Sequence, residues 1–351
     1  MSIDVVVLGG AGYVGAELLR LISAHPEFEL AAAVSSTYAG KPIGDVFPHL
    51  SPACGGTPFS TPDEWIDQVE SGSKLAIFSA APHGASAPII ADAITRAQNN
   101  GAEVHVVDSS ADFRFNDTAT FAAIYGQEHP EPDLVKAFHC SVPEHADQVS
   151  VPHAGHPGCF ATATLLAAVP LVEAGVVDDN LFVTGITGST GSGRTANAGT
   201  HHPERNSNLY AYKPLAHRHA PEVEALITKA TGTTAAIHFV PHSGPFARGI
   251  HITLQASLSD DLNVMQIGEI FRNAYAASTF VRFIDGTPRV KNVVASNYAH
   301  IGAAVGNGTV TVMCVIDNLV KGAAGGAMQW MNRLWDLPEE TGLTTVAPAW
   351  T

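Results

Sequence analysis

The chain has 351 residues, of which 46% are hydrophobic and 15% charged, with 32 Gly and 22 Pro. This length and composition suit two compact domains, or one domain with a large insertion, and exclude a disordered or coiled-coil protein. The 18 Lys and Arg against 33 Asp and Glu give a net charge of −15. Such a charge disfavours nonspecific binding to nucleic acid or to an anionic membrane. We therefore expect neither nucleic acid nor a membrane as a partner.

The four cysteines are widely spaced and form no CxxC pair: Cys54, Cys140, Cys159 and Cys314. This pattern is typical of reduced thiols rather than of a disulfide framework or a zinc knuckle. The N-terminus reads MSIDVVVLGG, without a basic segment ahead of a long apolar one, and no run reaches transmembrane length without polar interruption. The sequence therefore predicts a cytoplasmic protein.

In chain order, the first elements alternate between strand and helix. Residues 3–8 form a β-branched apolar run, residues 16–25 have a helical pattern, and residues 27–36 form a second strand. A strand at 75–80, a helix at 85–99 and a strand at 103–110 continue the alternation. This pattern predicts a doubly wound parallel sheet, which we place in residues 1–157.

The second part of the chain has a different texture. A loop runs into an apolar helix at 155–175, and a strand at 181–190 leads into a Gly/Ser-rich loop. Several β-rich runs follow between 234 and 315, with one helical stretch near 264–277. We predict an α+β domain over 158–317 with a mixed, mostly antiparallel sheet, followed by a closing helix in 318–351.

Three glycines stand at the turn from the first strand into the first helix. Gly9, Gly12 and Gly15 form a G-x-x-G-x-x-G pattern that encloses Tyr13 and Val14. At this place glycines let a pyrophosphate reach the helix N-terminus. A tight strand-to-helix turn is the alternative, but the strand before and the helix after favour a dinucleotide site.

The second strand ends at Val34-Ser35-Ser36-Thr37, where an NAD site usually has an Asp or Glu for the ribose 2′-hydroxyl. Hydroxyls there, with Lys41 nearby, tolerate a 2′-phosphate. We therefore predict NADP(H) as the cofactor, with Ser35 and Ser36 as contacts. The alternative is that the two serines merely begin a loop.

Cys159 lies in His156-Pro157-Gly158-Cys159, just before an apolar helix. Unpaired N–H groups and the helix dipole at that position stabilise a thiolate, which makes Cys159 a candidate nucleophile. For the other three cysteines a small core residue is the better interpretation.

The general acid/base can come from His217-Arg218-His219. Glu222 follows this motif at a spacing that can orient one imidazole. The spacing does not say which histidine faces the thiol. Metal binding by this cluster is the competing interpretation, but an HxH pattern without a third well-spaced ligand is weak, and we predict no metal.

The segment 188–194 is a Gly/Ser-rich loop after a strand, which suits contact with an oxyanion or a cofactor ring through Gly188 and Ser189. Arg114 and Arg248 can each supply the planar fork that holds a carboxylate or a phosphate. A lone arginine is more often a surface residue, so these two need further support.

Several motifs in order resemble the N-acetyl-γ-glutamyl-phosphate reductases of arginine biosynthesis. They are GGAGYVGAELLRLISAHP, SADFR, PGCFATA, GSTGSGR, HRHAPEV and DNLVKGAAGGAMQ, and they extend along nearly the whole chain. The resemblance implies the fold of the aspartate-semialdehyde and glyceraldehyde-phosphate dehydrogenases. That fold has a Rossmann domain, a catalytic α+β domain that also mediates dimerisation, and a C-terminal helix that returns to the first domain.

The resemblance also implies roles for particular residues. Cys159 becomes the nucleophile, with His219 or His217 as the acid/base. The implied cofactor contacts are Gly9, Gly12, Tyr13, Val14, Gly15, Ser35, Ser36, Gly188, Ser189 and Asn318. The implied substrate ligands are Arg114, Ser189, Arg248 and His217. Members of the family are homodimers or homotetramers.

Other stretches point to a sister branch that reduces aminoadipyl phosphate on a small acidic carrier protein. The chain reads Phe160-Ala161 where many arginine-pathway members read Tyr-Pro, and the segments 201–205 and 212–214 look like that branch. An acidic carrier would be repelled by a chain of charge −15. We therefore favour a free acyl phosphate, with carrier-bound aminoadipyl or glutamyl phosphate as the alternative.

The sequence thus predicts NADPH-dependent reduction of N-acetyl-γ-glutamyl phosphate through a thioester on Cys159. Two alternatives come from other classes. One is a non-catalytic protein that senses NADP(H), against which the intact Cys159 and His219 argue. The other is a zinc enzyme that uses the histidines.

Overall fold

The computed structural model describes residues 2–115 and 117–350, and the chain divides into two compact units. The first unit contains the residues up to 140, residues 148–156 and residues 323–344. The second unit contains residues 141–147, residues 157–322 and the residues from 345 onward. Each unit has its own sheet, so each is described by itself.

The first unit is built on a six-stranded parallel sheet with the order β2-β1-β3-β4-β6-β5. Its strands are β1 (Ile3–Leu8), β2 (Phe28–Val34), β3 (Lys74–Ser79), β4 (Glu103–Asp108), β5 (Phe138–Cys140) and β6 (His153–Gly155). The inner strands read as nearly continuous apolar runs, as expected for strands buried on both faces. The predicted doubly wound parallel sheet is confirmed.

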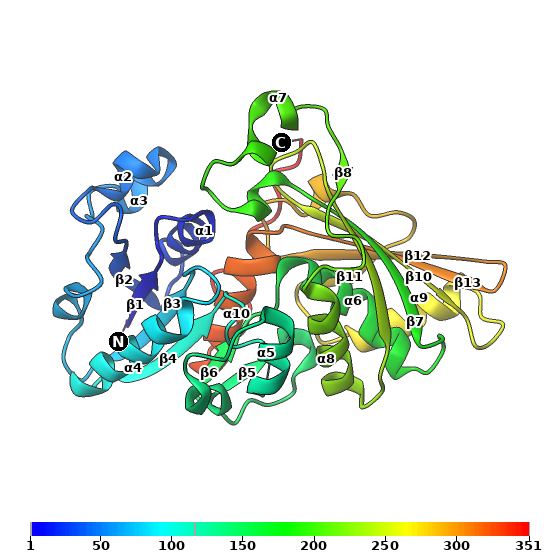
Figure 1. Ribbon diagram of the computed structural model, residues 1–351, viewed down its shortest axis with the longest axis horizontal. Coiled ribbons are helices and arrows are strands. Elements are labelled where there is room, and N and C mark those ends of the chain that lie inside the picture. The colour runs from blue at the N-terminus through cyan, green and yellow to red at the C-terminus, as the bar shows by residue number, and fades with distance from the viewer. Residues whose placement is uncertain (1, 116, 351) are drawn as a thin grey trace. The chain divides into compact units, whose positions relative to one another are not determined.

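The helices of the first unit are α1 (Tyr13–Ile22), α2 (Ile43–Val46), α3 (Ser51–Cys54), α4 (Ser86–Asn99), α5 (Thr118–Tyr125) and α10 (Gly325–Leu334). Helix α4 packs on β3 and β4, whereas α1 packs on β1, β2 and α10 (Figure 1). The C-terminal helix α10 also contacts β4 and β6. It is anchored by Asn332, whose Oδ1 lies 3.0 Å from Nε2 of His25.

The strand order places a ligand crevice in the first unit. From β1 the chain moves to β2 on one side, and β3 then pairs with β1 on the other side. In such sheets the carboxyl ends of the two strands at the reversal point line a binding crevice. The glycine turn after β1 lies at this point.

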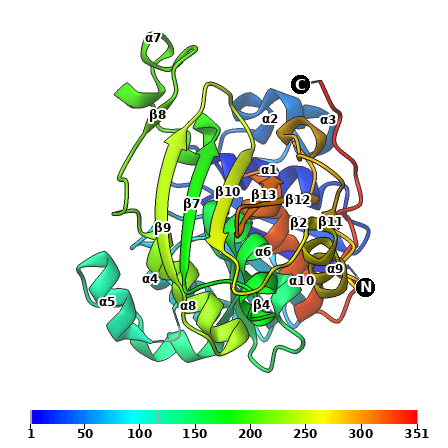
Figure 2. The same cartoon turned by 90° about the vertical axis from the view of Figure 1, so that its right-hand side faces the viewer.

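The second unit holds a seven-stranded mixed sheet with the order β11-β12-β13-β10-β7-β9-β8. Its strands are β7 (Asn180–Thr187), β8 (Tyr210–Ala211), β9 (Ala236–Ser243), β10 (Ile250–Ser257), β11 (Val281–Phe283), β12 (Ala299–Gly306) and β13 (Thr309–Ile316). Most neighbouring pairs are antiparallel, and the pairs β7–β9 and β11–β12 are parallel. The predicted mixed sheet is confirmed, and Figure 2 shows β9, β7 and β10 side by side.

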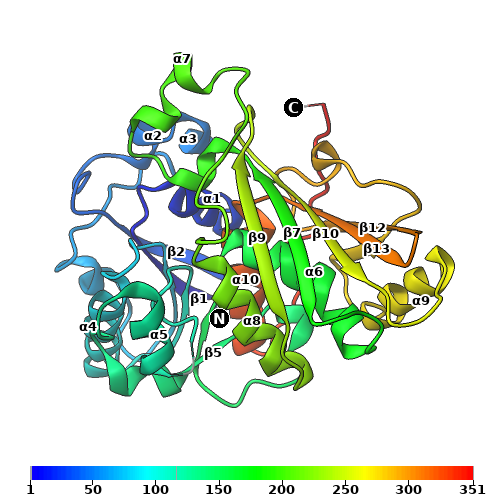
Figure 3. The ribbon, with the colours of Figure 1, turned by 45° about the vertical axis from the view of Figure 1, so that its right-hand side comes forward.

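The helices of the second unit are α6 (Cys159–Glu173), α7 (His202–Arg205), α8 (His219–Thr231) and α9 (Val264–Ala274). Helix α6 is the central one, because it contacts β7, β10 and β13 of the sheet as well as α8 and α9 (Figure 3). Residues 160–172 of this helix are all buried. Its first residue, Cys159, is therefore held by a rigid, fully packed element.

The closing helix differs from the sequence-based prediction at its start. The closing helix is predicted within 318–351, but residues Val320–Ala324 form a π-helix, and regular α-helix begins only at Gly325. Local π turns are frequent near functional sites. Within the described part of the chain, no helix combines the length and the apolar character needed to cross a membrane.

Candidate active site

The turn between β1 and α1 depends on its glycines. Gly9 has a φ of +73°, and a Cβ there would lie 2.7 Å from the carbonyl oxygen of Ala80 at the end of β3. A Cβ at Gly15 would lie 2.5 Å from the carbonyl oxygen of Gly10. Gly12 is the N-cap of α1 and has no side chain to occupy the helix end. The turn therefore fits a dinucleotide pyrophosphate, which needs a bare backbone at this place.

Two serines follow β2, as the sequence indicates. Ser35 is buried, and its Oγ accepts a hydrogen bond of 3.2 Å from the backbone N–H of Tyr38. Ser36 is exposed. The hydroxyl of Ser35 thus stabilises the turn, whereas Ser36 is accessible to a ribose 2′-phosphate.

Arg114 lies in the first unit, on the loop after β4, and only 4% of its surface is exposed. Its Nη2 donates to the carbonyl oxygen of Ser109 at 3.2 Å. The loop is tied to the start of α4 by Asp112, whose carboxylate accepts from the backbone N–H groups of Gly84, Ser86 and Ala87 at 2.8, 3.0 and 3.0 Å. The guanidinium of Arg114 is therefore held by a well-ordered loop. The other predicted substrate ligands belong to the second unit.

Cys159 is the first residue of α6, and it is partly exposed. The π-helix reaches it through Gly322, where a Cβ would lie 2.7 Å from Cβ of Cys159 and 3.1 Å from its Cα. Only glycine allows this approach. A thiol at the first position of a helix faces the positive end of the helix dipole, which favours the thiolate.

Glu222, which the sequence suggests as the acid that orients a histidine, also contacts the N-terminal end of α6. Its side chain is completely buried, and Oε1 accepts a hydrogen bond of 2.7 Å from the backbone N–H of Gly158, the N-cap of α6. Its Oε2 lies 3.9 Å from Nε2 of His219, the first residue of α8. One carboxylate thus joins the helix end that carries the thiol to the helix end that carries an imidazole.

The second histidine is fixed in another way. Nδ1 of His217 accepts a hydrogen bond of 3.2 Å from the backbone N–H of His219. Burial, followed by the positive charges of Arg218 and Lys213, lowers the pKa of His217 to about 4. At neutral pH this ring is therefore uncharged, and with Nδ1 as the acceptor its proton lies on Nε2.

Aromatic rings surround both imidazoles. The ring of Phe160 lies 6.3 Å from that of His217 and 6.2 Å from that of His219. Tyr212 packs edge-on against His217 at 5.6 Å. Burial, followed by the negative charge of the Cys159 thiolate, raises the pKa of the Tyr212 hydroxyl. The thiol, the two imidazoles and a tyrosine therefore belong to one cluster in the second unit.

The Gly/Ser-rich loop after β7 uses its backbone donors inside the protein. The N–H groups of Gly188, Ser189 and Thr190 donate to the carbonyl oxygens of Gly249, Phe246 and Ala247 at 2.9, 2.9 and 3.1 Å. The N–H groups of these three residues are therefore engaged within the protein, and contact of the loop with an oxyanion or a cofactor ring through Gly188 and Ser189 stays a prediction. A ligand would meet the hydroxyl side chains of the loop rather than these N–H groups.

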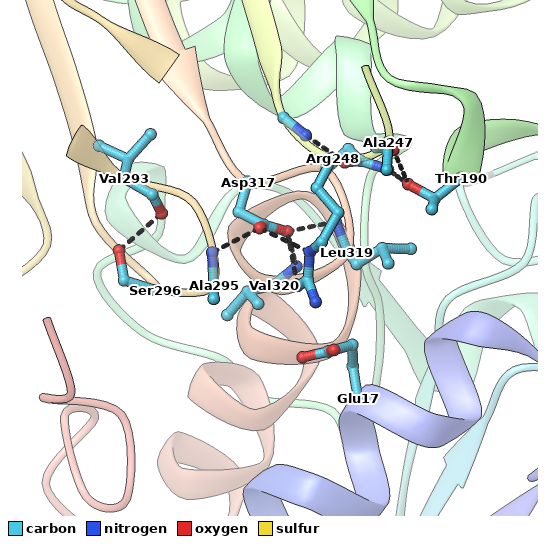
Figure 4. A network of polar contacts seen from close by, with 12 residues as sticks. Glu17, Thr190, Ala247, Arg248, Val293, Ala295, Ser296, Asp317, Leu319 and Val320 are labelled. Atoms are coloured by element: carbon cyan, nitrogen blue, oxygen red, sulfur yellow. Dashed lines mark hydrogen bonds and ion pairs between the residues drawn. The ribbon is translucent and has the colours of Figure 1, made fainter. Parts of the chain in front are cut away.

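Arg248 and Asn318 are both held by hydrogen bonds within the second unit. Nε and Nη2 of Arg248 both donate to the carboxylate of Asp317, at 3.0 and 3.1 Å (Figure 4). The amide of Asn318 is engaged at both ends, since Oδ1 accepts from Gly249 N at 2.7 Å and Nδ2 donates to Oγ1 of Thr190 at 3.0 Å. Among the described residues, no three His, Cys, Asp or Glu side chains group closely enough to hold a metal ion.

The structure adds two residues that the sequence analysis did not single out for the site, Tyr212 and Asp317. Both had a weak signal. Asp317 follows a long apolar strand at once, and a charge in that place is either exposed or paired. Tyr212 precedes the His217-Arg218-His219 motif by five residues, but no sequence rule places its ring beside a thiol.

Two family models together match most of the chain. Residues 4–147 match the NAD binding domain of semialdehyde dehydrogenases, and residues 159–318 match the semialdehyde dehydrogenase dimerisation domain.

The chain is also similar along its length to curated proteins named N-acetyl-gamma-glutamyl-phosphate reductase. The protein from Pelotomaculum thermopropionicum is 34% identical over 98% of each chain. The protein from Symbiobacterium thermophilum is 36% identical over 100% of each chain.

Solved structures with the same fold include aspartate semialdehyde dehydrogenases. Aspartate semialdehyde dehydrogenase II of Vibrio cholerae, complexed with ASA, has a TM-score of 0.68 at 15% identity and covers 96% of this chain and 98% of its own. The Candida albicans enzyme with NADP has a TM-score of 0.67 at 16% identity, with coverages of 96% and 99%. These likenesses confirm the predicted fold class.

Proposed function

The chain belongs to the N-acetyl-gamma-glutamyl-phosphate reductase family, and on that premise we propose that it reduces N-acetyl-γ-glutamyl phosphate to N-acetyl-glutamate semialdehyde and phosphate through a thioester on Cys159. The observation that carries the residue assignment is the position of Cys159 at the N-terminus of α6. Glu222 supports it by linking that helix end to His219.

NADP(H) is the cofactor that the first unit suits. The bare glycine turn before α1 would hold the pyrophosphate, with the backbone of Tyr13 and Val14 beside it at the helix end. Ser36 would face the 2′-phosphate, because β2 is followed by hydroxyls and by no carboxylate. When bound, NADPH supplies the hydride that reduces the thioester to the aldehyde.

The thiolate of Cys159 attacks the acyl carbon, so that a C–S bond forms and the C–O bond to the phosphoryl group breaks. The dipole of α6 stabilises the thiolate before the attack. Phosphate leaves as an anion, and we propose the guanidinium groups of Arg248 and Arg114 as ligands of the phosphoryl group or of the substrate carboxylate. The hydroxyl of Ser189 is a further ligand for the substrate.

The two histidines take different parts in the reaction. His217 is neutral with its proton on Nε2, so it donates a hydrogen bond to the oxygen of the tetrahedral adduct. His219 lies beside the carboxylate of Glu222, which stabilises the imidazolium form. We therefore assign proton transfer to His219, which takes the proton of the thiol and returns it as the hemithioacetal collapses.

Further features of the assignment remain proposals. A free small-molecule acyl phosphate is favoured over a carrier-bound one by the net charge of −15. We propose a homo-oligomer from the family resemblance, and a division near residue 157 from the change in sequence pattern there. The four cysteines are in the thiol form, which agrees with a reducing compartment and supports a cytoplasmic location.

The test is phosphate-dependent reduction of NADP⁺ with N-acetyl-glutamate semialdehyde, measured for the wild type and for Cys159→Ala. We expect the variant to lose at least about a thousandfold in kcat, because no other group can form the thioester. Cys54→Ala is the matched control, since Cys54 is also partly exposed but lies in α3 of the first unit. It should retain full activity.

The result for the wild type decides between substrates. Activity that depends on phosphate and on Cys159 supports the proposal. A folded wild type that is inactive with this semialdehyde but active with the carrier-bound aminoadipyl semialdehyde would assign the chain to the alternative reaction. Wild-type activity retained in Cys159→Ala would refute the thioester mechanism.

A further inference from the structure

One buried carboxylate in the second unit accepts hydrogen bonds from five N–H donors. Asp317 follows β13 directly and is completely buried. Besides the guanidinium of Arg248, it accepts from the backbone N–H groups of Leu319 and Val320 at 2.8 and 2.9 Å and of Ala295 at 2.6 Å (Figure 4). Since a carboxylate has about four lone-pair sites, its acceptor capacity is fully used.

The contact with Asp317 fixes the orientation of the Arg248 guanidinium group. A bidentate pair between a guanidinium and a carboxylate is planar, so it sets the orientation of the whole guanidinium group. Asp317 occupies the edge formed by Nε and Nη2. The side chain of Arg248 has 24% of its surface exposed.

The backbone donors tie the same carboxylate to the surroundings of the thiol. Leu319 and Val320 begin the segment that becomes the π-helix, and Gly322 N donates to the carbonyl oxygen of Asp317 at 3.0 Å. Gly322 is the residue that packs against Cβ of Cys159. Asp317 therefore contacts both Arg248 and the turn that supports the nucleophile.

Electrostatics alone would not favour an acid in this place. The negative charge of Asp317 weakens the attraction of Arg248 for an anionic substrate, because the two charges nearly cancel at a distance. The compensating effect of Asp317 is that it holds the guanidinium in place before the anion binds. A guanidinium held in one orientation loses little conformational freedom when an anion binds.

We propose that Asp317 is a positioning residue, which fixes the guanidinium of Arg248 so that it receives an oxyanion of the substrate at a set place relative to the thiol of Cys159. The oxyanion is the phosphoryl group or the carboxylate of the substrate. This inference rests on the proposed function, in which Arg248 binds the substrate.

The experiment compares the wild type with Asp317→Asn in the reverse reaction, where phosphate and semialdehyde have separate KM values. Asparagine has nearly the same shape, but its amide nitrogen cannot accept from the donors that face it. We expect one KM to rise about tenfold or more. A rise for phosphate identifies the phosphoryl group, and a rise for semialdehyde identifies the carboxylate.

Whether KM rises or falls in Asp317→Asn distinguishes a role of Asp317 in orienting Arg248 from an effect of its charge. If Asp317 only weakened the charge of Arg248, its neutralisation would lower the KM of the anion that Arg248 binds. Lowered or unchanged KM values would therefore overturn the proposal. In Arg248→Lys, which cannot form the planar pair, addition of Asp317→Asn should cause less than about a twofold further change, because Asp317 acts through Arg248.

Ser296→Ala is the matched control for damage to the local fold. Oγ of Ser296 donates to the carbonyl oxygen of Val293 at 2.7 Å, in the turn that also holds Ala295 (Figure 4). We expect KM values within about twofold of the wild type. An equal rise in both KM values in Ser296→Ala and Asp317→Asn would mean a general loss of structure and would overturn the proposal.

Two further measurements keep the test decisive. If Asp317→Asn does not fold, Asp317→Glu keeps the charge but displaces the carboxylate by one methylene, and it should raise the same KM. If the wild type has no phosphate-dependent activity, the proposed function fails. The role of Asp317 is then measured by the rise in Tm on adding inorganic phosphate, which should be smaller in Asp317→Glu than in the wild type and in Ser296→Ala.

Discussion

Two helices in this molecule, α1 and α6, begin on a glycine N-cap, which has no side chain of its own to satisfy the first turn. At α1 the backbone closes on itself, since Gly12 N donates to Gly9 O at 3.3 Å. At α6 the N–H of Gly158 instead donates to the carboxylate of Glu222, which comes from another helix. Both turns place a glycine directly before the helix, but their environments differ.

This difference between the two turns corresponds to two uses of a helix N-terminus, ligand binding at α1 and the positioning of catalytic groups at α6. A turn made of backbone alone retains the positive end of its helix dipole for a ligand that brings its own negative charge, such as a pyrophosphate. A turn that receives a carboxylate has part of that field offset. In return the carboxylate fixes where Cys159 and His219 lie. A glycine before a helix therefore does not by itself indicate whether the helix end binds a ligand or positions a catalytic residue.

The largest expected effect in this comparison comes from Glu222→Gln. The amide can still accept from Gly158, but it no longer stabilises a positive charge on His219. We expect kcat to fall about a hundredfold, because general acid/base catalysis typically contributes that much. The dependence of kcat on pH should change as well, which a purely structural defect would not cause. Steady-state kinetics between pH 6 and 9 check both.

Glu224→Gln is the matched control for that variant. Glu224 lies on the same helix, and its Oε1 also accepts from a backbone N–H, that of Ile237 at 2.9 Å. It contacts neither helix end of the site. Its kcat should stay within about twofold of the wild type. An equal loss of kcat in both variants would show that α8 is merely destabilised and that the contrast between the two turns has no catalytic meaning.

The next effect concerns the turn before α1. A methyl group in Gly15→Ala would lie 2.5 Å from the carbonyl oxygen of Gly10, so the turn must open. We expect the Kd for NADPH to rise about tenfold and unfolding to become easier by about 1–3 kcal/mol. Fluorescence titration and thermal unfolding measure the two changes. In Gly56→Ala, where a Cβ meets nothing within 4 Å, neither should change.

Most of the architecture could be predicted because it depends on local patterns. The strands β1, β3 and β4 each contain a mainly apolar run, which predicts strands buried on both faces, and the glycine turn after β1 predicts the position of α1. The mixed sheet of the second unit could be predicted as a class. Its strand order could not, because pairings such as β10 with β7 join segments far apart in the sequence.

The site was only partly predictable, because several of its essential contacts are long-range. That Glu222 bonds to Gly158, 64 residues earlier, has no sequence signal. The bidentate pair of Asp317 with Arg248 spans 69 residues. The backbone donors of the loop at Gly188 are used internally, which no motif indicates. Residue types could be proposed from the sequence, but their partners are set by the tertiary fold.

The last effect is on stability in acid, and it also compares the two units. Burial lowers the pKa of His153 in the first unit to about 4, and burial likewise lowers the pKa of His145 in the second unit to about 4. Such a histidine stays neutral when folded but takes up a proton when unfolded below about pH 6.5. Acid therefore favours unfolding, by about 1.4 kcal/mol per pH unit for each such histidine between pH 6.5 and 4.

The second unit should lose more protection from hydrogen exchange than the first between pH 7 and pH 5. His217, beside the turn of α6, adds a further ring with its pKa lowered to about 4, whereas the turn of α1 contains no histidine. Protection factors for peptides from α6 and β1 measure the difference. His153→Gln should flatten the pH dependence in β1 alone, because glutamine binds no proton in either state. If α6 and β1 lost protection equally in this variant, the two units would unfold as one, and the contrast between their helix ends would not extend to stability.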